Sequence, residues 1–244
     1  MNYDLKIFYN LDDLSKQFAE LLKKEVNSVK DKFNFVLSGG STPKHIFKYL
    51  SAHYQNNIQW NKINFFWGDE RCVPPDNDDS NYKMAFENLL SNINIPERNV
   101  FRILGEVDPI EETKRYSEVI IKNVKYDKSV PSFDLVMLGL GEDGHTASIF
   151  PHQLQLINDD KIYSIASHPV TGQQRITITG QVINNARNIV FIVSGKRKSE
   201  IVADILTNKI ESKKYPAHFV KPINGKLIWL LDQNAASLLK GNYN

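Results

Sequence analysis

The sequence lacks most of the features that mark secreted and membrane proteins. It contains one cysteine, Cys72, which excludes an intramolecular disulfide framework and favours a reducing compartment. Its uninterrupted apolar runs, such as residues 227–231 (LIWLL), are far too short to cross a bilayer. The first residues, MNYDLK, show no basic segment leading into an apolar one, so we expect no signal peptide. These absences predict a soluble, cytoplasmic protein.

The sequence also lacks an excess of charge of either sign. Its 30 Lys and Arg against 28 Asp and Glu give a net charge of +2, which is too small for a nucleic-acid-binding surface. Any anion must therefore be bound locally by a few cations. No HExxH, CxxC or EF-hand pattern is present, so no metal site is predicted. The 244 residues, with 41% hydrophobic and no Pro/Gly-rich linker, predict one domain over residues 1–244.

Short apolar segments alternate with helical patterns along the chain. Apolar residues at three- and four-residue spacing predict helices at residues 11–30, 81–90 and 111–123, and further helices follow residues 43 and 198. Four strands are expected at residues 33–37, 63–67, 133–138 and 189–193, each running into a glycine-containing loop. Residues 175–179 (RITIT) alternate and favour an antiparallel strand at the sheet margin, and residues 227–231 a late strand ending at Asp232. This order predicts an α/β fold with a mostly parallel sheet covered by helices on both faces.

Polar residues suited to binding or catalysis follow the carboxyl ends of the four strands. In open α/β sheets, ligands bind beyond these ends. Residues 38–43 (SGGSTP) precede a helix, so their backbone N–H groups and hydroxyls suit a phosphate, although an ordinary capped turn is the alternative. The lysine of a nucleoside-triphosphate loop is absent.

The loop at residues 139–145 (GLGEDGH) holds the candidate general base. It fits GxGxxG formally, but Glu142 and Asp143 would face a pyrophosphate, which disfavours a dinucleotide. Asp143 lies two positions before His145, and a nearby carboxylate can orient an imidazole as a general base. The other five histidines are interpreted as structural or surface residues.

Cations occur near three of these loops. Residues 69–71 (DER) follow the second strand, Arg175 lies on the alternating strand, and Lys198 closes a basic triplet at a helix start. Each could be a solvated surface charge, but cations at a helix start oppose its dipole, which a bound anion would explain. We interpret Cys72 as a buried structural thiol.

Three motifs together resemble a known family. They are residues 37–43 (LSGGSTP), residues 66–74 (FWGDERCVP) with 79–82 (DSNY), and residues 138–151 (LGLGEDGHTASIFP). The patterns at residues 175–177 (RIT), 195–198 (GxxK) and 229–232 (WLLD) follow in the same order. The sequence resembles the 6-phosphogluconolactonases, which are related to glucosamine-6-phosphate deaminases.

The resemblance implies a Rossmann-like α/β fold and hydrolysis of 6-phospho-D-glucono-1,5-lactone to 6-phospho-D-gluconate, the second step of the oxidative pentose phosphate pathway. It implies no cofactor, no metal and no obligatory protein partner. His145 would be the general base that activates water, and either Asp143 or Asp69 would orient it. The residues implied to bind the phosphate and the sugar are Ser38, Gly39, Gly40, Ser41, Thr42, Arg71, Arg175 and Lys198.

Two segments depart from the family pattern, and three alternative functions remain open. Residues 151–156 (PHQLQL) and 169–174 (PVTGQQ) are atypical and put substrate fit in question rather than reaction type. A glucosamine-6-phosphate deaminase has an acidic residue just after the Asp-Gly-His motif, where this chain has SIFP at residues 148–151. A non-catalytic sugar-phosphate-binding regulator would need the cations but not the base. A dinucleotide-dependent dehydrogenase ranks third.

Overall fold

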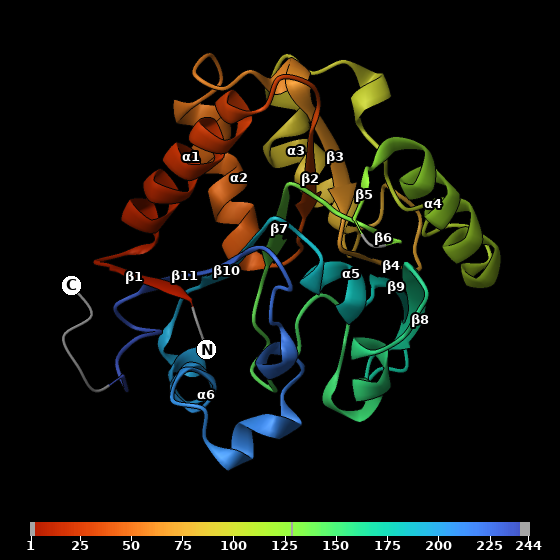
Figure 1. Cartoon of the computed structure of the whole chain (residues 1–244). Helices are drawn as coiled ribbons and strands as arrows, with labels where there is room; N and C mark the ends of the chain where they lie inside the picture. Colours follow the sequence, from red (N-terminus) through yellow and green to blue (C-terminus); the bar gives the residue numbers. More distant parts are fainter. Residues whose placement is uncertain (1–2, 128, 240–244) are drawn as a thin grey trace.

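The computed structural model describes residues 3–127 and 129–239, and its centre is a six-stranded parallel sheet (Figure 1). Strand order across this sheet is β1-β11-β10-β7-β2-β3. The strands are β1 (Asp4–Phe8), β2 (Phe33–Leu37), β3 (Ile63–Trp67), β7 (Leu135–Leu138), β10 (Asn188–Val193) and β11 (Lys226–Asp232). All neighbouring pairs run parallel. The predicted α/β fold with a mostly parallel sheet is confirmed.

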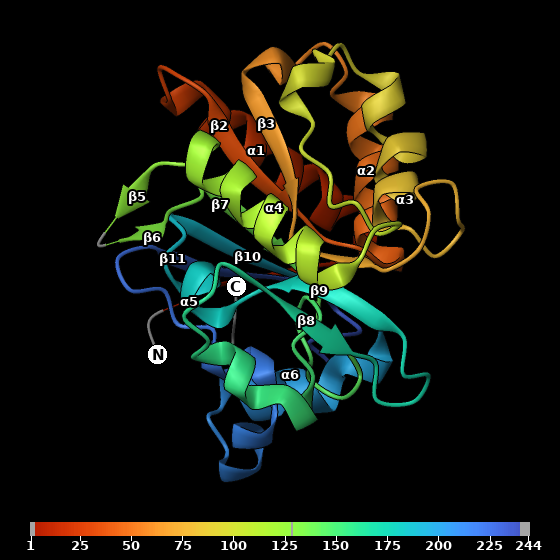
Figure 2. The same cartoon turned by 90° about the vertical axis from the view of Figure 1, so that its right-hand side faces the viewer.

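Helices cover both faces of the sheet, as Figures 1 and 2 show. They are α1 (Leu11–Ser28), α2 (Ser41–His53), α3 (Asn81–Asn88), α4 (Pro109–Asn123), α5 (Gly180–Asn184) and α6 (Ser199–Leu206). Every residue of β2, β3, β7 and β10 is buried, because a parallel sheet between two helical layers has no solvated face. None of the helices described is long and apolar enough to cross a membrane.

Aromatic side chains fill the core on both sides of the sheet. On the α1 side, Phe18 packs on Phe35 and Phe35 on Phe65, with ring centroids 6.1 and 5.9 Å apart. On the other side, Phe66 stacks on Phe101 at 4.8 Å and meets Phe133 edge-on at 5.4 Å. One buried hydrophobic cluster includes residues from β2, β3, β7, β10 and β11, and the partly buried side chains of β1 pack against it. The single domain stays a prediction, and its ends at residues 1–2 and 240–244 lie outside the described residues.

A second, antiparallel sheet differs from the expected arrangement. The strand predicted at residues 175–179 is β9 (Gln174–Ile178), and it lies between β4 (Asp69–Arg71) and β8 (Tyr163–Ser167) rather than at the margin of the central sheet. The chain leaves the central sheet at Gly68, whose N–H donates to Leu37 O and whose carbonyl accepts from Ile178 N. The structure also contains a short hairpin of β5 (Tyr126–Asp127) and β6 (Val130–Pro131).

In the N-terminal region one prediction needs correction and one strand was missed. The first helix ends at Ser28 rather than at residue 30, because Val29 already has extended backbone angles. Strand β1 was not predicted; it pairs with β11 at the sheet edge, and its partly exposed residues lack the continuous apolar run of the central strands.

The hydroxyl of Tyr116 ties α4 to the end of β3. It accepts a hydrogen bond from Trp67 N at 3.0 Å and donates one to Phe101 O at 2.8 Å, and Tyr116 is fully buried. Tyr116→Phe would leave both backbone groups buried without a partner, so we expect it to lower the free energy of unfolding by about 1–3 kcal/mol.

Urea denaturation measures this loss, and Tyr9→Phe is the matched control because Tyr9 is 75% exposed. Equal denaturation midpoints for the two variants would contradict this role of the Tyr116 hydroxyl.

Candidate active site

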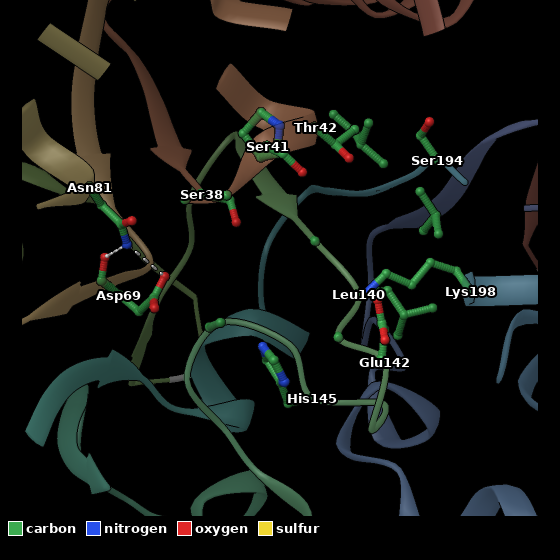
Figure 3. Close-up of a pocket in the computed structure, with 18 of the residues that line it drawn as sticks. Ser38, Ser41, Thr42, Asp69, Asn81, Leu140, Glu142, His145, Ser194 and Lys198 are labelled. Atoms are coloured by element: carbon green, nitrogen blue, oxygen red, sulfur yellow. Dashed lines mark hydrogen bonds between the residues drawn. The ribbon is translucent and has the colours of Figure 1, made fainter. Parts of the chain in front are cut away.

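A cavity of about 240 Å³ opens at the carboxyl ends of β2, β3, β7 and β10 (Figure 3). The loops that follow these strands form its walls, together with residues from α3 and β9. Its lining includes Ser38, Gly39, Gly40, Ser41, Thr42, Asp69, Arg71, Asn81, Glu142, His145, Arg175, Ser194 and Lys198. Ten of the eleven predicted site residues therefore share one cavity, and the eleventh, Asp143, contacts His145.

His145 and Asp143 form the central pair. The Nδ1 atom of His145 lies 2.6 Å from Oδ1 of Asp143, and the same oxygen accepts the backbone N–H of His145 at 3.1 Å. A carboxylate accepts at neutral pH, so Nδ1 carries the proton and Nε2 is the nitrogen left to accept one. Figure 3 shows the imidazole projecting into the cavity. Asp143, and not Asp69, is therefore the aspartate paired with His145.

The pairing changes the acidity of Asp143. Partial burial would raise its pKa, but the hydrogen bonds and the charge of His145 outweigh burial and lower the pKa from 3.8 to about 2. The unfolded chain therefore takes up this proton at a higher pH than the folded protein does. The stability that the pair contributes is present above pH 3.8 and is lost as the pH falls through about 2.

Glycines give the histidine loop, residues 139–147, its shape. A Cβ atom on Gly141 would lie 2.1 Å from Nδ1 of His145, so any side chain there would displace the imidazole. Gly144 has a φ of +81°, which favours glycine, and a Cβ there would lie 2.5 Å from the Tyr215 ring. The Phe150 ring packs against the imidazole with centroids 4.9 Å apart and covers it with an apolar surface.

Asp69 lies on a different wall and makes other contacts. Its Oδ2 accepts the Ser148 hydroxyl at 2.6 Å, and Asn81 Nδ2 donates to its backbone carbonyl at 2.9 Å. Ser148 also accepts from Arg175 Nη1 at 3.4 Å, which joins the carboxylate to a cation. Among the described contacts Asp69 has no hydrogen bond with His145, and its predicted catalytic role stays a prediction.

Two arginines face each other across neighbouring strands. Arg71 on β4 is paired directly with Arg175 on β9, although like charges at such positions repel. In each of them Nε is buried without a hydrogen-bond partner among the described residues. Burial lowers the pKa of Arg175, and the charge of Asp69 opposes this effect. Both arginines line the cavity, and an anion bound there would relieve the repulsion between their charges.

The start of α2 offers a second place for an anion. The side chains of Asn10, Ser80 and Asp108 cap α1, α3 and α4. The N-cap residue of α2 is Gly40, which has no side chain to cap the helix. Ser41 and Thr42 line the cavity, and their N–H groups, the first of the helix, have no intrahelical acceptor.

Lys198 reaches the cavity from the loop after β10 (Figure 3). Burial lowers the pKa of its amine, and the charges of Glu142 and Asp143 oppose this effect. Buried Asp232 fixes this loop by accepting from Ser194 Oγ at 2.5 Å and from Gly195 N at 3.0 Å. Lys198 itself follows in a single 3₁₀ turn before α6.

Several residues of the site were not predicted. Asn81, Glu142 and Ser194 line the cavity, and Ser148 and Asp232 hold site residues in place. The only signal for them was their position inside or beside the family motifs. Cys72 is half-buried, and burial with the charge of Glu70 raises its thiol pKa to about 11, which fits an unreactive thiol. Among the described residues no cluster of His, Cys, Asp or Glu could hold a metal ion.

The fold and this site define an α/β protein with a hydrogen-bonded His–Asp pair beside a cavity lined by arginine and lysine side chains. Residues 10–229 match the family described as glucosamine-6-phosphate isomerases/6-phosphogluconolactonase. The 6-phosphogluconolactonase of Haemophilus influenzae is 42% identical over 206 residues, covering 83% of this chain and 86% of that protein. The chain therefore belongs to the glucosamine-6-phosphate isomerase/6-phosphogluconolactonase family.

Solved structures agree with this assignment. The 6-phosphogluconolactonase of Trypanosoma brucei has a TM-score of 0.89 at 29% identity, covering 98% of this chain and 99% of that one. A monomeric glucosamine-6-phosphate deaminase has a TM-score of 0.82 at 21% identity, covering 97% of this chain and 100% of that one, and shares the fold.

The acidity of Asp143 depends on its partner. In His145→Ala the carboxylate loses the imidazole donor but keeps its partial burial, so we expect its pKa to rise above about 2. Carboxyl-carbon NMR titration, over the pH range in which the protein stays folded, measures this change. His53→Ala, at the end of α2, is the control and should leave the value unchanged. A pKa that stays at about 2 in His145→Ala would show that another group holds Asp143 ionised.

Proposed function

We propose that this protein hydrolyses 6-phospho-D-glucono-1,5-lactone to 6-phospho-D-gluconate, the second step of the oxidative pentose phosphate pathway. The observation that carries the proposal is the Asp143-oriented imidazole of His145 in a cavity lined by cationic and N–H donors. The names of the relatives, at about 40% identity over most of the chain, support the same reaction.

The phosphate binds at the start of α2 in this proposal. The free N–H groups of Ser41 and Thr42 and the ammonium of Lys198 converge on one cavity, which suits a dianion. Arg71 and Arg175 supply further positive charge for the phosphate and for the oxyanion that forms at the lactone carbonyl. Binding energy from the phosphate then orients the reacting carbon, which lies at the far end of the molecule.

Hydrolysis needs no covalent intermediate, since a lactone is already an activated ester. His145 Nε2 takes a proton from a water molecule as the water oxygen bonds to the carbonyl carbon. Asp143 stabilises the imidazolium that results. The tetrahedral oxyanion then re-forms the carbonyl and the bond to the ring oxygen breaks. That oxygen takes the proton back from His145, which leaves an open-chain carboxylic acid and a hydroxyl. The acid then loses its proton to solvent at neutral pH and becomes the carboxylate.

The chain offers no carboxylate for deamination at the expected place. Residues 148–151 (SIFP) follow the histidine motif, and Phe150 covers the imidazole there. Lactone hydrolysis is therefore the better candidate than isomerisation with loss of ammonia.

The proposal is tested by the disappearance of lactone generated in situ, measured above its spontaneous hydrolysis. His145→Ala should lower kcat by about 10²–10⁴-fold, the usual contribution of a general base. His53→Ala is the matched control and should keep wild-type activity. Ammonia release from glucosamine 6-phosphate, with no effect on the lactone, would instead identify a deaminase.

Lys198 has a separable role in binding. Lys198→Met keeps the length of the side chain but removes a hydrogen bond and a charge from the phosphate, a loss of about 1.5–3 kcal/mol. We expect KM to rise about 10–100-fold, with inorganic phosphate losing its competitive inhibition to the same extent. Lys196→Met is the control from the same turn, because Lys196 does not line the cavity. An unchanged KM would place the phosphate elsewhere.

A further inference from the structure

The segment after α6 packs against the histidine loop, on Gly144. It forms two short 3₁₀ turns, Ile210–Lys214 and Pro216–Phe219. Ala217 N donates to Gly144 O at 3.1 Å, and the Tyr215 side chain packs directly on Gly144. Gly144 stands between Asp143 and His145, so this contact supports the catalytic pair at its middle residue.

A buried hydrogen bond connects the two turns. Ser212 Oγ lies 2.8 Å from His218 Nδ1, and the two residues are 0% and 4% exposed. Ser212 Oγ also donates to Lys209 O at 2.6 Å, which uses its only proton. His218 must therefore donate from Nδ1. Because the hydroxyl proton is directed at a carbonyl and the histidine is the donor, this pair is not an activated nucleophile.

The far end of the same segment is fixed by Asn184. Its side-chain amide donates to Phe219 O at 3.1 Å and accepts from Lys221 N at 2.7 Å. Residues 209–221 are thus held at the Ser212–His218 bond and again at Asn184. Tyr215 and Ala217, the residues that contact Gly144, lie in the stretch that the Ser212–His218 bond closes.

We infer that the Ser212–His218 hydrogen bond is a positioning element for His145, acting through Tyr215, Ala217 and Gly144. The inference rests on the proposed function of His145 as the general base. Within its own loop, His145 is held by its carbonyl, which accepts Gly141 N at 2.8 Å, and by its contacts with Asp143. Among the described residues outside the loop, Tyr215 and Ala217 contact the backbone of Gly144. A shift of Gly144 moves both members of the pair, and small displacements of a catalytic group reduce turnover steeply.

Ser212→Ala removes the acceptor of the His218 bond without touching the cavity. We expect kcat for the lactone to fall about tenfold while KM stays within about twofold, because the phosphate contacts are unchanged. Ser15→Ala is the control for a lost buried hydroxyl. Ser15 is 0% exposed, and its hydroxyl donates to Leu11 O at 2.6 Å within α1. It should keep the wild-type kcat.

Two replacements of His218 separate the hydrogen bond from simple packing. Asn places an amide nitrogen near the position of Nδ1, whereas Gln places it near Nε2. His218→Asn should therefore retain most of the wild-type kcat, and His218→Gln should behave like Ser212→Ala. Should the Ser212 and His218 variants not fold, Tyr215→Leu removes the contact with Gly144 directly and should give the same loss of kcat.

Hydrogen exchange of the peptide covering residues 139–147 gives a readout independent of activity. Exchange should be faster in Ser212→Ala and His218→Gln than in wild type, Ser15→Ala and His218→Asn. Faster exchange with an unchanged kcat, or unchanged exchange, would overturn the positioning role. A wild type that does not accelerate lactone hydrolysis would overturn the proposed function instead, and the exchange data would still decide whether the bond holds the loop.

Discussion

The 2.6 Å hydrogen bond between His145 Nδ1 and Asp143 Oδ1 is the contact on which the site depends. It fixes the tautomer that leaves Nε2 free for a proton, and it keeps a half-exposed carboxylate ionised. The surrounding sequence is constrained by it: Gly141 leaves room for the imidazole, Gly144 adopts a positive φ between the two partners, and Phe150 covers one side of the ring. The imidazole and its carboxylate partner are thus built into one loop, and Tyr215 and Ala217 support that loop from a distant segment.

The cations, in contrast, depend on the packing of both sheets. Lys198 comes from the central sheet, through the loop that Asp232 holds at the end of β11. Arg71 and Arg175 come from the antiparallel sheet, where their direct pairing places like charges together. Asp69 and Ser148 connect the two regions by a hydrogen bond that spans 79 positions of sequence. The cavity therefore combines a His–Asp pair from one loop with cations that come from two separate sheets.

The parts predictable from the sequence were those governed by local pattern. Buried runs such as residues 63–67 and 189–193 predicted central strands, and their glycine loops predicted the edge where the cavity lies. Strand β4, at three residues, was too short to be distinguished from a loop, so the second sheet was not predicted. The sequence left Asp69 and Asp143 equivalent as partners of His145, because the choice depends on a distance. Asp232 could not be linked to Lys198 for the same reason, since hydrogen bonds between remote segments have no periodic signal.

The sheet order has a consequence for how the protein is made. Strand β1 pairs with β11, which lies far along the sequence, with Asp4 opposite Ile228 and Phe8 opposite Asp232. Strand β1 therefore has no strand partner until residues 226–232 have been synthesised. Asp232 emerges with the same late strand, and without it the loop carrying Lys198 lacks its anchor. A nascent chain can form β2, β3 and β7 early, but the histidine loop gains its contact with Ala217 and the Lys198 loop its contact with Asp232 only after those later segments leave the exit tunnel.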